Sequence, residues 1–288
     1  MIKKVKNILP ENLFSYLKFL YSLPKYYRLR KFFEKNRELR NIHKGKRCFI
    51  LGSGPSIKKE DLKLLKNEIV IALNNFYVHE DFQEIMNGDV SKYYMTAPIH
   101  APQTTKEWEE WFKDMAENIP KNCEMFFGLN ARKEDIKSIL DKNNLFRNLK
   151  INWYFATKNF NYNTLNKKGL DITKPILAAE AVSVYALIIA LYMGFDDIIL
   201  LGMDHDYFLY DDEKDMRMYK SAIHQKDEFQ RTFGNDFFID EFLRQYRIFK
   251  KYRMIDINTD NKILNASDGG ILKVFEKIKY SELFEEEI

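Results

Sequence analysis

Short runs of apolar residues, separated by segments with helical patterns, constrain the fold of this 288-residue chain most strongly. Residues 47–52, 68–73 and 197–202 are almost continuously apolar after their first residue, and small or polar residues follow each run. Strands without alternation between polar and apolar positions are buried on both faces, as in a parallel sheet covered by helices. The pattern predicts an α/β fold, a Rossmann-like and mostly parallel sheet with helices on both faces.

Hydrophobic periodicity places the remaining elements along the chain. Further strands are predicted at residues 91–97, 123–129, 152–155 and 254–258. Helices are predicted at residues 60–66, 104–118, 133–141 and 176–193, with one or two more within 227–250, interrupted near Gly234 and Asn235. In such a sheet, ligands bind beyond the carboxyl ends of the strands near a topological switch point. Polar residues that follow strands are therefore the candidates for a site.

The N-terminal segment differs from the rest of the chain in charge. Residues 1–47 hold fourteen Lys and Arg against three acidic residues, a net charge of +11 compared with +4 for the whole chain. Pro10 and Pro24 are expected to divide the segment into helices at residues 11–22 and 25–41. We therefore predict a basic, aromatic, helical appendage over residues 1–46 and an α/β domain over residues 47–288.

A basic helix interleaved with aromatic residues suits an anionic membrane surface. Alternatively, the appendage packs on the domain with a solvated basic face, or mediates homo-oligomerisation. Nucleic acid is not expected as a partner, because the positive charge is confined to the appendage and no recognition motif accompanies it. Glu11 and scattered cations interrupt any signal-peptide core, so the chain is predicted to be cytoplasmic, including a peripheral position on the inner face of the cytoplasmic membrane.

The sharpest local motif is Gly52-Ser53-Gly54-Pro55-Ser56, which follows the first predicted strand. Glycines there let the backbone approach a phosphate or ribose closely. The motif is neither the dinucleotide fingerprint nor a Walker A loop, and the alternative is a turn without a ligand.

Two further polar loops follow strands. The amides of Asn74 and Asn75, after the second strand, suit a ribose or base edge, or else simple turn chemistry. Near the C-terminus, the loop containing Ser267 and Gly269 could close over a nucleotide, or be a surface turn.

Titratable residues after the strand at 197–202 offer two kinds of chemistry. Asp204 and Asp206 could hold a divalent metal; alternatively, Asp204 is a buried residue that orients its neighbours. His224 lies in a polar region and could accept a proton from a hydroxyl group. The competing histidines are His43, His79, His100 and His205.

Several of these blocks together resemble a known enzyme family. Residues 49–56, 71–77 and 182–204 resemble the first strand and loop, the second strand, and the central helix and following strand of bacterial CMP-sialic-acid-dependent sialyltransferases of the lipooligosaccharide type. The same blocks, with residues 257–259 and 265–267, are also similar to the group that includes the Maf proteins and 6-hydroxymethylpterin diphosphokinase. The resemblance covers about residues 47–280 and leaves residues 1–46 outside it.

The resemblance implies a single nucleotide-binding α/β domain, a GT-A-like variant, that needs no metal and uses a histidine base with tyrosines on the CMP phosphate. It assigns nucleotide contacts to Gly52, Ser53, Gly54, Ser56, Asn74 and Ser183, and catalytic roles to His224, Tyr207 and Tyr210. The motifs after the strands add Pro55, Asn75, Asp204, Ser267 and Gly269 to the predicted nucleotide site. The chain departs from the family at Ser53, where the family has asparagine, and at residues 177–180, which lack the arginine before the central helix. The donor sugar could therefore be sialic acid, another nonulosonic acid or Kdo.

The expected function is transfer of an acidic sugar from a CMP-activated donor to a bacterial surface glycan or lipid-linked glycan, without a metal or other cofactor. Two alternatives remain open. One is an ATP- and Mg²⁺-dependent diphosphokinase of the 6-hydroxymethylpterin type, with Asp204 and Asp206 as metal ligands. The other is a non-catalytic scaffold that binds a nucleotide sugar.

Overall fold

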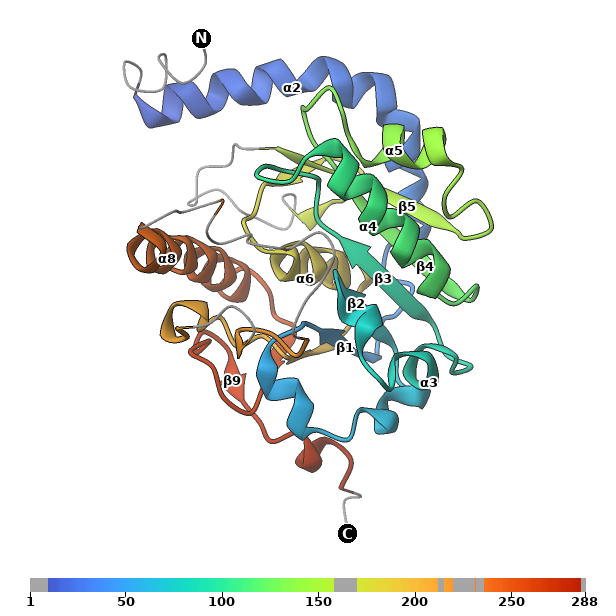
Figure 1. The fold of residues 1–288 in the computed structure, drawn as a ribbon, viewed down its shortest axis with the longest axis vertical. Coiled ribbons are helices and arrows are strands. Elements are labelled where there is room, and N and C mark those ends of the chain that lie inside the picture. Colours follow the sequence, from blue (N-terminus) through green and yellow to red (C-terminus); the bar gives the residue numbers. More distant parts are fainter. Residues whose placement is uncertain (1–9, 158–169, 212–214, 220–230, 232–235, 286–288) are drawn as a thin grey trace.

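The computed structural model describes residues 10–157, 170–211, 215–219, 231 and 236–285 (Figure 1). Within these ranges it has a nine-stranded sheet in the order β6-β5-β4-β3-β2-β1-β7-β8-β9, with parallel pairing throughout. The strands are β1 (Arg47–Leu51), β2 (Val70–Leu73), β3 (Lys92–Thr96), β4 (Cys123–Leu129), β5 (Ile151–Thr157), β6 (Pro175–Leu177), β7 (Asp197–Leu201), β8 (Lys262–Asn265) and β9 (Glu276–Lys277). The α/β fold with a parallel sheet is confirmed.

Helices cover both faces of this sheet. The α-helices are α2 (Glu11–Glu34), α3 (Phe82–Met86), α4 (Thr105–Asn118), α5 (Ile136–Asn143), α6 (Val182–Met193) and α8 (Phe237–Asp256). In β1, Cys48 and Ile50 point into the core layer that contains α6, whereas Phe49 and Leu51 point into the layer that contains α3, α4 and α5. Burial on both faces explains why these strands lack polar positions.

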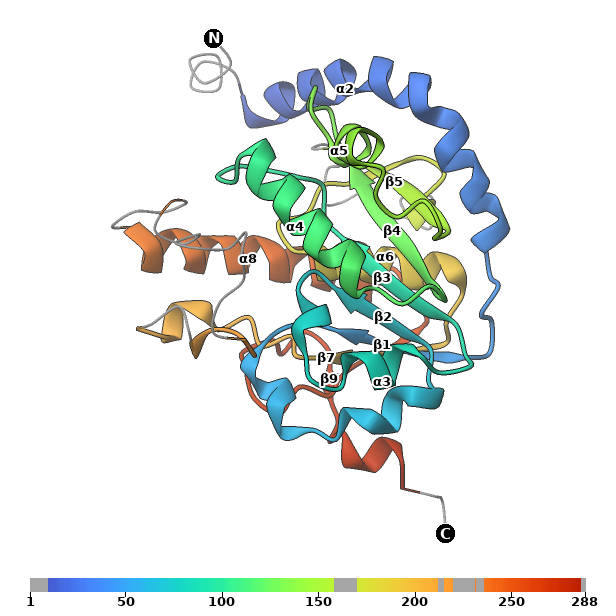
Figure 2. The ribbon, with the colours of Figure 1, turned by 45° about the vertical axis from the view of Figure 1, so that its right-hand side comes forward.

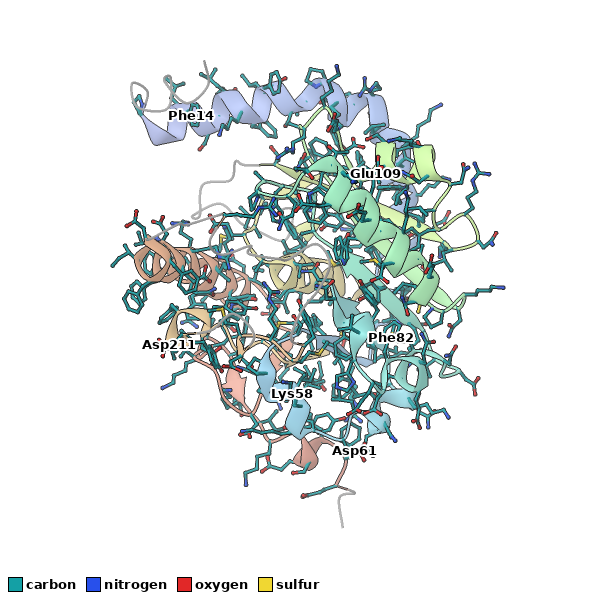
Figure 3. The ribbon with its side chains drawn as sticks, in the orientation of Figure 1. Phe14, Lys58, Asp61, Phe82, Glu109 and Asp211 are labelled. Carbon is teal, nitrogen blue, oxygen red and sulfur yellow. The ribbon has the colours of Figure 1, made fainter. Side chains whose placement is uncertain are left out.

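The helix predicted at residues 60–66 is instead a 3₁₀ turn, η3 (Leu62–Asn67), and a first 3₁₀ turn, η2 (Pro55–Lys59), precedes it. Glu60 has extended backbone angles and separates the two turns. Asp61 caps η3 by accepting a hydrogen bond from the Lys63 amide at 3.2 Å (Figure 3). The two buried leucines of η3 lie three residues apart, the spacing that a 3₁₀ turn places on one side.

Two other predicted elements differ from the structure. The helix predicted at residues 176–193 is confirmed only over Val182–Met193 (α6), because residues 175–177 pair with β5 as the edge strand β6 and Ala181 still has extended backbone angles. The strand predicted at residues 254–258 starts inside α8, where Ile248, Tyr252 and Ile255 bury one helical face. The strands at this end of the sheet are β8 and β9.

Helix α2 is continuous through Pro24, so the predicted break at this residue is wrong. Pro24 is exposed and removes only one main-chain hydrogen bond, whereas buried contacts hold the flanking turns in place. The Tyr26 hydroxyl donates to the carbonyl of Thr173 at 3.0 Å, and the Phe33 ring stacks on the Tyr26 ring. Helix α2 therefore packs against the domain along β5 (Figure 2). None of the described helices is both long enough and apolar enough to cross a bilayer.

Candidate functional site at the β1–β7 switch point

The order of the strands reverses at β1, which pairs with β2 on one side and with β7 on the other. Gly52 follows β1 and Gly202 follows β7, so two glycines meet at the carboxyl edge. A Cβ atom on Gly52 would lie 2.5 Å from the carbonyl oxygen of Gly202, and Gly202 itself has a φ of +64°. Glycine is required at both positions, and the close approach forms the floor of a crevice at the switch point.

A pocket of about 800 Å³ opens at this edge. The structure brings six of the predicted site residues to its lining: Gly52, Ser53, Asn74, Ser183, Asp204 and Tyr207. The first residues of α6 also line the pocket, and α6 begins without a side-chain cap. Uncapped main-chain N–H groups at a helix start attract anions.

Asp204, in the turn after β7, binds the loop of residues 52–56, here called the glycine loop. Its Oδ2 accepts a hydrogen bond from the main-chain N–H of Ser56 at 2.8 Å, and its Oδ1 accepts one from the Ser56 hydroxyl. A Cβ atom on Gly54 would lie 2.5 Å from Asp204 Oδ2. Burial raises the pKa of Asp204, and the two hydrogen bonds from Ser56 oppose this rise. Asp204 thus orients the loop, while Ser56 faces the carboxylate and lies outside the pocket lining.

Asp206 and Tyr210 lie beside Asp204, outside the pocket lining. The Tyr210 hydroxyl donates to Asp206 Oδ2 at 3.4 Å, and Asp206 Oδ1 is buried without a hydrogen-bond partner in the described part of the chain. Burial and the nearby charge of Asp204 raise the pKa of Asp206. Among the described residues, no group of three His, Cys, Asp or Glu side chains could hold a metal ion.

The two adjacent asparagines after β2 point to different environments. Asn74 has a φ of +50° and lines the pocket. Asn75 is fully buried: its Oδ1 accepts from Trp111 Nε1 at 2.6 Å, and its Nδ2 donates to the Tyr219 hydroxyl at 2.9 Å. Only Asn74 therefore has a side chain placed for a ligand.

The loop after β8 packs against the turn that carries Asp204. The Ser267 hydroxyl accepts from the main-chain N–H of Met203 at 3.0 Å, and the Lys277 ammonium donates to the carbonyls of Ser267 and Gly269. A Cβ atom on Gly270 would lie 2.4 Å from the backbone of Asp204. Ser267 and Gly269 are outside the pocket lining, so this loop braces the Asp204 turn.

A buried chain of hydrogen bonds leads from the pocket into α8. His205 Nδ1 lies 2.8 Å from Gln245 Oε1, and His205 Nε2 lies 2.9 Å from the Tyr252 hydroxyl, which in turn bonds to the Ser183 hydroxyl. Burial lowers the pKa of His205 to about 4, so its ring is neutral at pH 7. His205 also has a φ of +58°, an uncommon backbone conformation for this residue.

The donor and acceptor of each hydrogen bond in this series follow from the contact between Gln245 and Glu241. Gln245 Nε2 donates to Glu241 Oε1 at 2.5 Å, so Gln245 Oε1 is the acceptor for a proton on His205 Nδ1. His205 Nε2 then accepts from the Tyr252 hydroxyl, and the Tyr252 oxygen accepts from Ser183. Ser183 therefore presents its lone pairs to the pocket.

Cationic side chains that sequence reasoning missed also line the pocket: Lys18, Arg132, Lys133, Arg217 and Arg244. Arg217 lies over the ring of Tyr207 at 5.4 Å and donates to the Tyr219 hydroxyl at 3.3 Å. The next residue, Met218, donates its main-chain N–H to the Ser53 carbonyl at 2.8 Å, which seats this segment on the glycine loop. No motif spacing marks these cations as a group, because they come from four segments, one of which carries both Arg132 and Lys133, that meet only in the fold.

Of the histidines considered, His100 and His205 line the pocket. His100 Nδ1 lies 2.7 Å from the carbonyl oxygen of Ala101, so Nδ1 carries the proton and Nε2 is left with its lone pair. His43 is buried against Tyr93 at 2.7 Å, and His79 stacks on Phe76, both away from the pocket. His224 lies outside the described residues.

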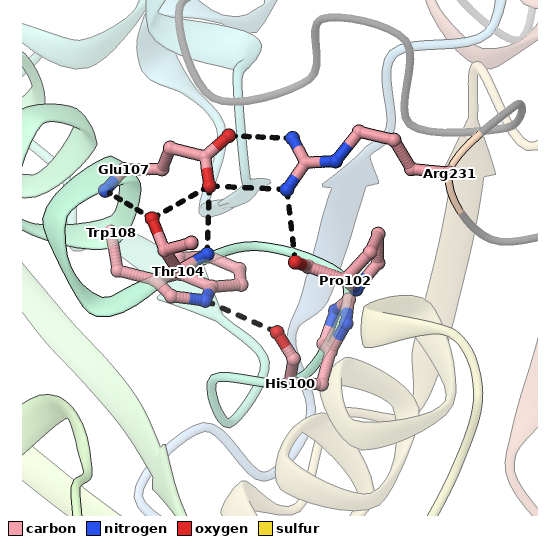
Figure 4. Close-up of polar contacts among 6 residues, drawn as sticks. All are labelled: His100, Pro102, Thr104, Glu107, Trp108 and Arg231. Atoms are coloured by element: carbon pink, nitrogen blue, oxygen red, sulfur yellow. Dashed lines mark hydrogen bonds and ion pairs between the residues drawn. The ribbon is translucent and has the colours of Figure 1, made fainter.

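The start of α4 fixes the loop that carries His100 (Figure 4). Trp108 Nε1 donates to the His100 carbonyl at 3.2 Å, and Thr104 forms a capping box with Glu107. Arg231 donates to Glu107 Oε1 at 2.5 Å and to the Pro102 carbonyl at 2.9 Å. The hydrogen bond from Arg231 lowers the pKa of Glu107 to about 2. These contacts join Arg231 to the rim of the pocket.

Comparison with known proteins gives a structural similarity only. No family model matches the chain, and no curated protein matches it. Among solved structures, the chain is similar to the sialyltransferase CstII from Campylobacter jejuni in complex with a substrate analogue, cytidine-5′-monophosphate. The TM-score is 0.42 and the sequence identity 17%, over 82% of this chain and 85% of that chain. The resemblance to the Maf and 6-hydroxymethylpterin diphosphokinase group finds no support in these comparisons.

Proposed function

We propose that the chain is a glycosyltransferase that takes an acidic sugar from a CMP-activated donor. The observation that carries the proposal is the pocket at the switch point, where glycine backbone, the start of α6 and arginine side chains surround one cavity. A CMP-activated acidic sugar carries a phosphate and a carboxylate, and both need such donors. A volume of about 800 Å³ lies within the range of small-molecule sites.

The nucleotide would lie along the glycine loop. The backbone of Gly52 and Ser53 would lie against the ribose and phosphate, and the Asn74 amide would bond to the ribose or base. Ser56, Asn75 and Ser267 would contribute indirectly, since each is engaged in a contact that shapes these loops. Ser183 would accept a hydrogen bond from a donor hydroxyl or amide N–H.

The departing phosphate would be stabilised by Arg217, with Tyr207 beneath the guanidinium group. A fixed cation favours the transition state because it faces charge that develops on the leaving group. Tyr210 is the weaker candidate for this role, since it bonds to Asp206 outside the pocket lining. Asp204 is engaged on both oxygens by Ser56, which favours transfer without a metal ligand at this residue.

A histidine would deprotonate the acceptor hydroxyl. His224 remains our proposal from the sequence. His100 is a second candidate, because it lines the pocket and the Ala101 carbonyl holds the tautomer with a basic Nε2. His205 is unsuited, because both of its ring nitrogens are engaged in buried hydrogen bonds.

The test is release of CMP from CMP-sialic acid or CMP-Kdo by the full chain in the presence of a glycan acceptor, with and without EDTA. The proposal predicts turnover that EDTA leaves unchanged, and an Arg217→Gln variant slower by about 100-fold. CMP release that stops in EDTA would contradict transfer without a metal. AMP release from ATP in the presence of 6-hydroxymethylpterin, without CMP release from either donor, would favour the diphosphokinase, for which the unpartnered Asp206 Oδ1 is the supporting observation. Nucleotide binding without any turnover would favour the scaffold.

A further inference from the structure

Helix α2 is apolar on two opposite sides. Its inner side buries Tyr26 and Phe33 against the domain. On its outer side, large apolar residues recur at spacings of three and four, which places them in one stripe. These residues are Leu13, Tyr16, Leu17, Leu20 and Tyr27, with exposed fractions between 40% and 61%. Tyr21 lies at the edge of this stripe, on the side of the helix that lines the pocket.

The stripe is open in the structure. Helix α2 lies at the periphery of the molecule in both ribbon views (Figures 1 and 2), and the labelled Phe14 marks its N-terminal part in Figure 3. Single exposed apolar residues are ordinary, whereas a contiguous exposed stripe indicates a partner.

Charge identifies the partner as anionic. Along the same outward side of the helix, the apolar stripe passes into the exposed cations Arg28 and Lys31, and the exposed Lys35 follows the last residue of α2. The segment of residues 1–47 carries a net charge of +11. An apolar stripe continued by cations suits the headgroup region of an anionic bilayer, where apolar side chains enter the interface and cations meet lipid phosphates.

We propose that the outer side of α2 docks on an anionic lipid bilayer. Lys18, Tyr21 and Ser22 of the same helix line the pocket, so docking would hold the pocket beside the membrane. The acceptor would then be a lipid-linked glycan, which is the one part of this inference that rests on the proposed function. Docking itself does not depend on it.

Sedimentation with phosphatidylcholine vesicles, with and without phosphatidylglycerol, tests the docking. The wild-type chain is expected to sediment with the phosphatidylglycerol vesicles. A variant with both Leu17→Glu and Leu20→Glu is expected to bind at least about tenfold more weakly, because it lacks two apolar side chains that enter the bilayer interface on docking. Arg28→Ala and Lys31→Ala should each weaken binding about fivefold, and added salt should reduce these differences.

The matched control is Ile239→Glu with Leu243→Glu, which changes two aliphatic residues of similar exposure on α8 and should leave vesicle binding unchanged. CMP titration should give the same affinity for the wild type and for the Leu17, Leu20 variant, whatever the vesicles show, so failure of docking is separate from failure of the proposed function. Absence of wild-type binding to either vesicle would overturn the inference. So would equal losses in the α2 and α8 variants, or a concentration-dependent dimer that the α2 variant abolishes.

Discussion

His205 and Tyr252 form a buried hydrogen bond, with His205 Nε2 2.9 Å from the tyrosine hydroxyl. This bond links the turn after β7 to α8, and through the tyrosine it reaches Ser183 at the start of α6. Three elements that surround the pocket are thus joined by one side chain. Because the polar groups are buried, losing one partner leaves the others without a hydrogen bond.

Tyr252→Phe should therefore lower the free energy of unfolding by about 1–3 kcal/mol, since it removes one hydroxyl and strands two buried groups. Urea unfolding of the variant and the wild type measures the difference. Tyr246→Phe is the matched control on the same helix, because Tyr246 is exposed, and it should change stability by less than about 0.5 kcal/mol. Equal stabilities of Tyr252→Phe and the wild type would show that the buried hydrogen bonds of Tyr252 do not contribute to stability.

Buried neutral histidines should make stability depend on pH. Burial lowers the pKa of His43 and of His205 to about 4, from 6.5. Below pH 6.5 the unfolded chain takes up protons that the folded chain does not, so stability falls as the pH drops from 6.5 towards 4. Each histidine adds a slope of up to about 1.4 kcal/mol per pH unit.

Urea unfolding at several pH values measures this slope. His205→Asn should reduce it, and asparagine tolerates the positive φ of this position. A slope in this window that the variant leaves unchanged would show that His205 is not held neutral by the fold.

Lys92 is a buried cation that should contribute to stability through its hydrogen bonds. Its Nζ donates to the carbonyls of Leu65, Lys66 and Glu68 at 2.8–2.9 Å, and burial lowers its pKa to about 8. Lys92→Met leaves three carbonyls without this donor and should cost at least about 2 kcal/mol.

The matched control for Lys92 is Lys66→Met, which changes an exposed side chain in the neighbouring turn and should be close to neutral. Chemical denaturation of both variants measures the effects. Similar stabilities of the two variants would show that the three hydrogen bonds add little.

Asp204→Asn should loosen the glycine loop because it weakens the hydrogen bonds from Ser56, and not because a metal ligand is lost. The amide loses one acceptor for the two donors of Ser56, so the loop is less well held and nucleotide affinity should fall about tenfold. Asp211→Asn, at an exposed position, is the control. Calorimetry with and without EDTA separates the two accounts, because a loss of wild-type affinity in EDTA that is absent from Asp204→Asn would make Asp204 a metal ligand instead.

The sheet was predictable from the sequence where burial alone decides the residue types. Strand β4 begins and ends at the predicted residues, and β1 and β7 differ from prediction only by a terminal glycine. Predictions failed where tertiary contacts outweigh local preference. Buried contacts carry α2 through Pro24, and pairing with β5 turns residues 175–177 into a strand.

The candidate site was predictable only in part. The glycine loop and Asn74 carry their signal locally, because each follows a strand directly. The sequence shows that Ser56 and Asn75 can form hydrogen bonds, but it does not show with which partners. In the structure, Ser56 bonds to Asp204 and Asn75 to Trp111, so neither side chain is placed for a ligand. Arg217 and Arg244 reach the pocket from segments distant in sequence, so no local pattern could mark them.

Calorimetric titration of the full chain with CMP tests the central claim most directly, with UDP, GDP and ATP as comparisons. The account predicts one saturable CMP site, weaker binding of the other nucleotides, and loss of most CMP affinity in Arg217→Gln. The absence of CMP binding at millimolar concentration in a folded sample, or CMP binding that Arg217→Gln leaves intact, would contradict it.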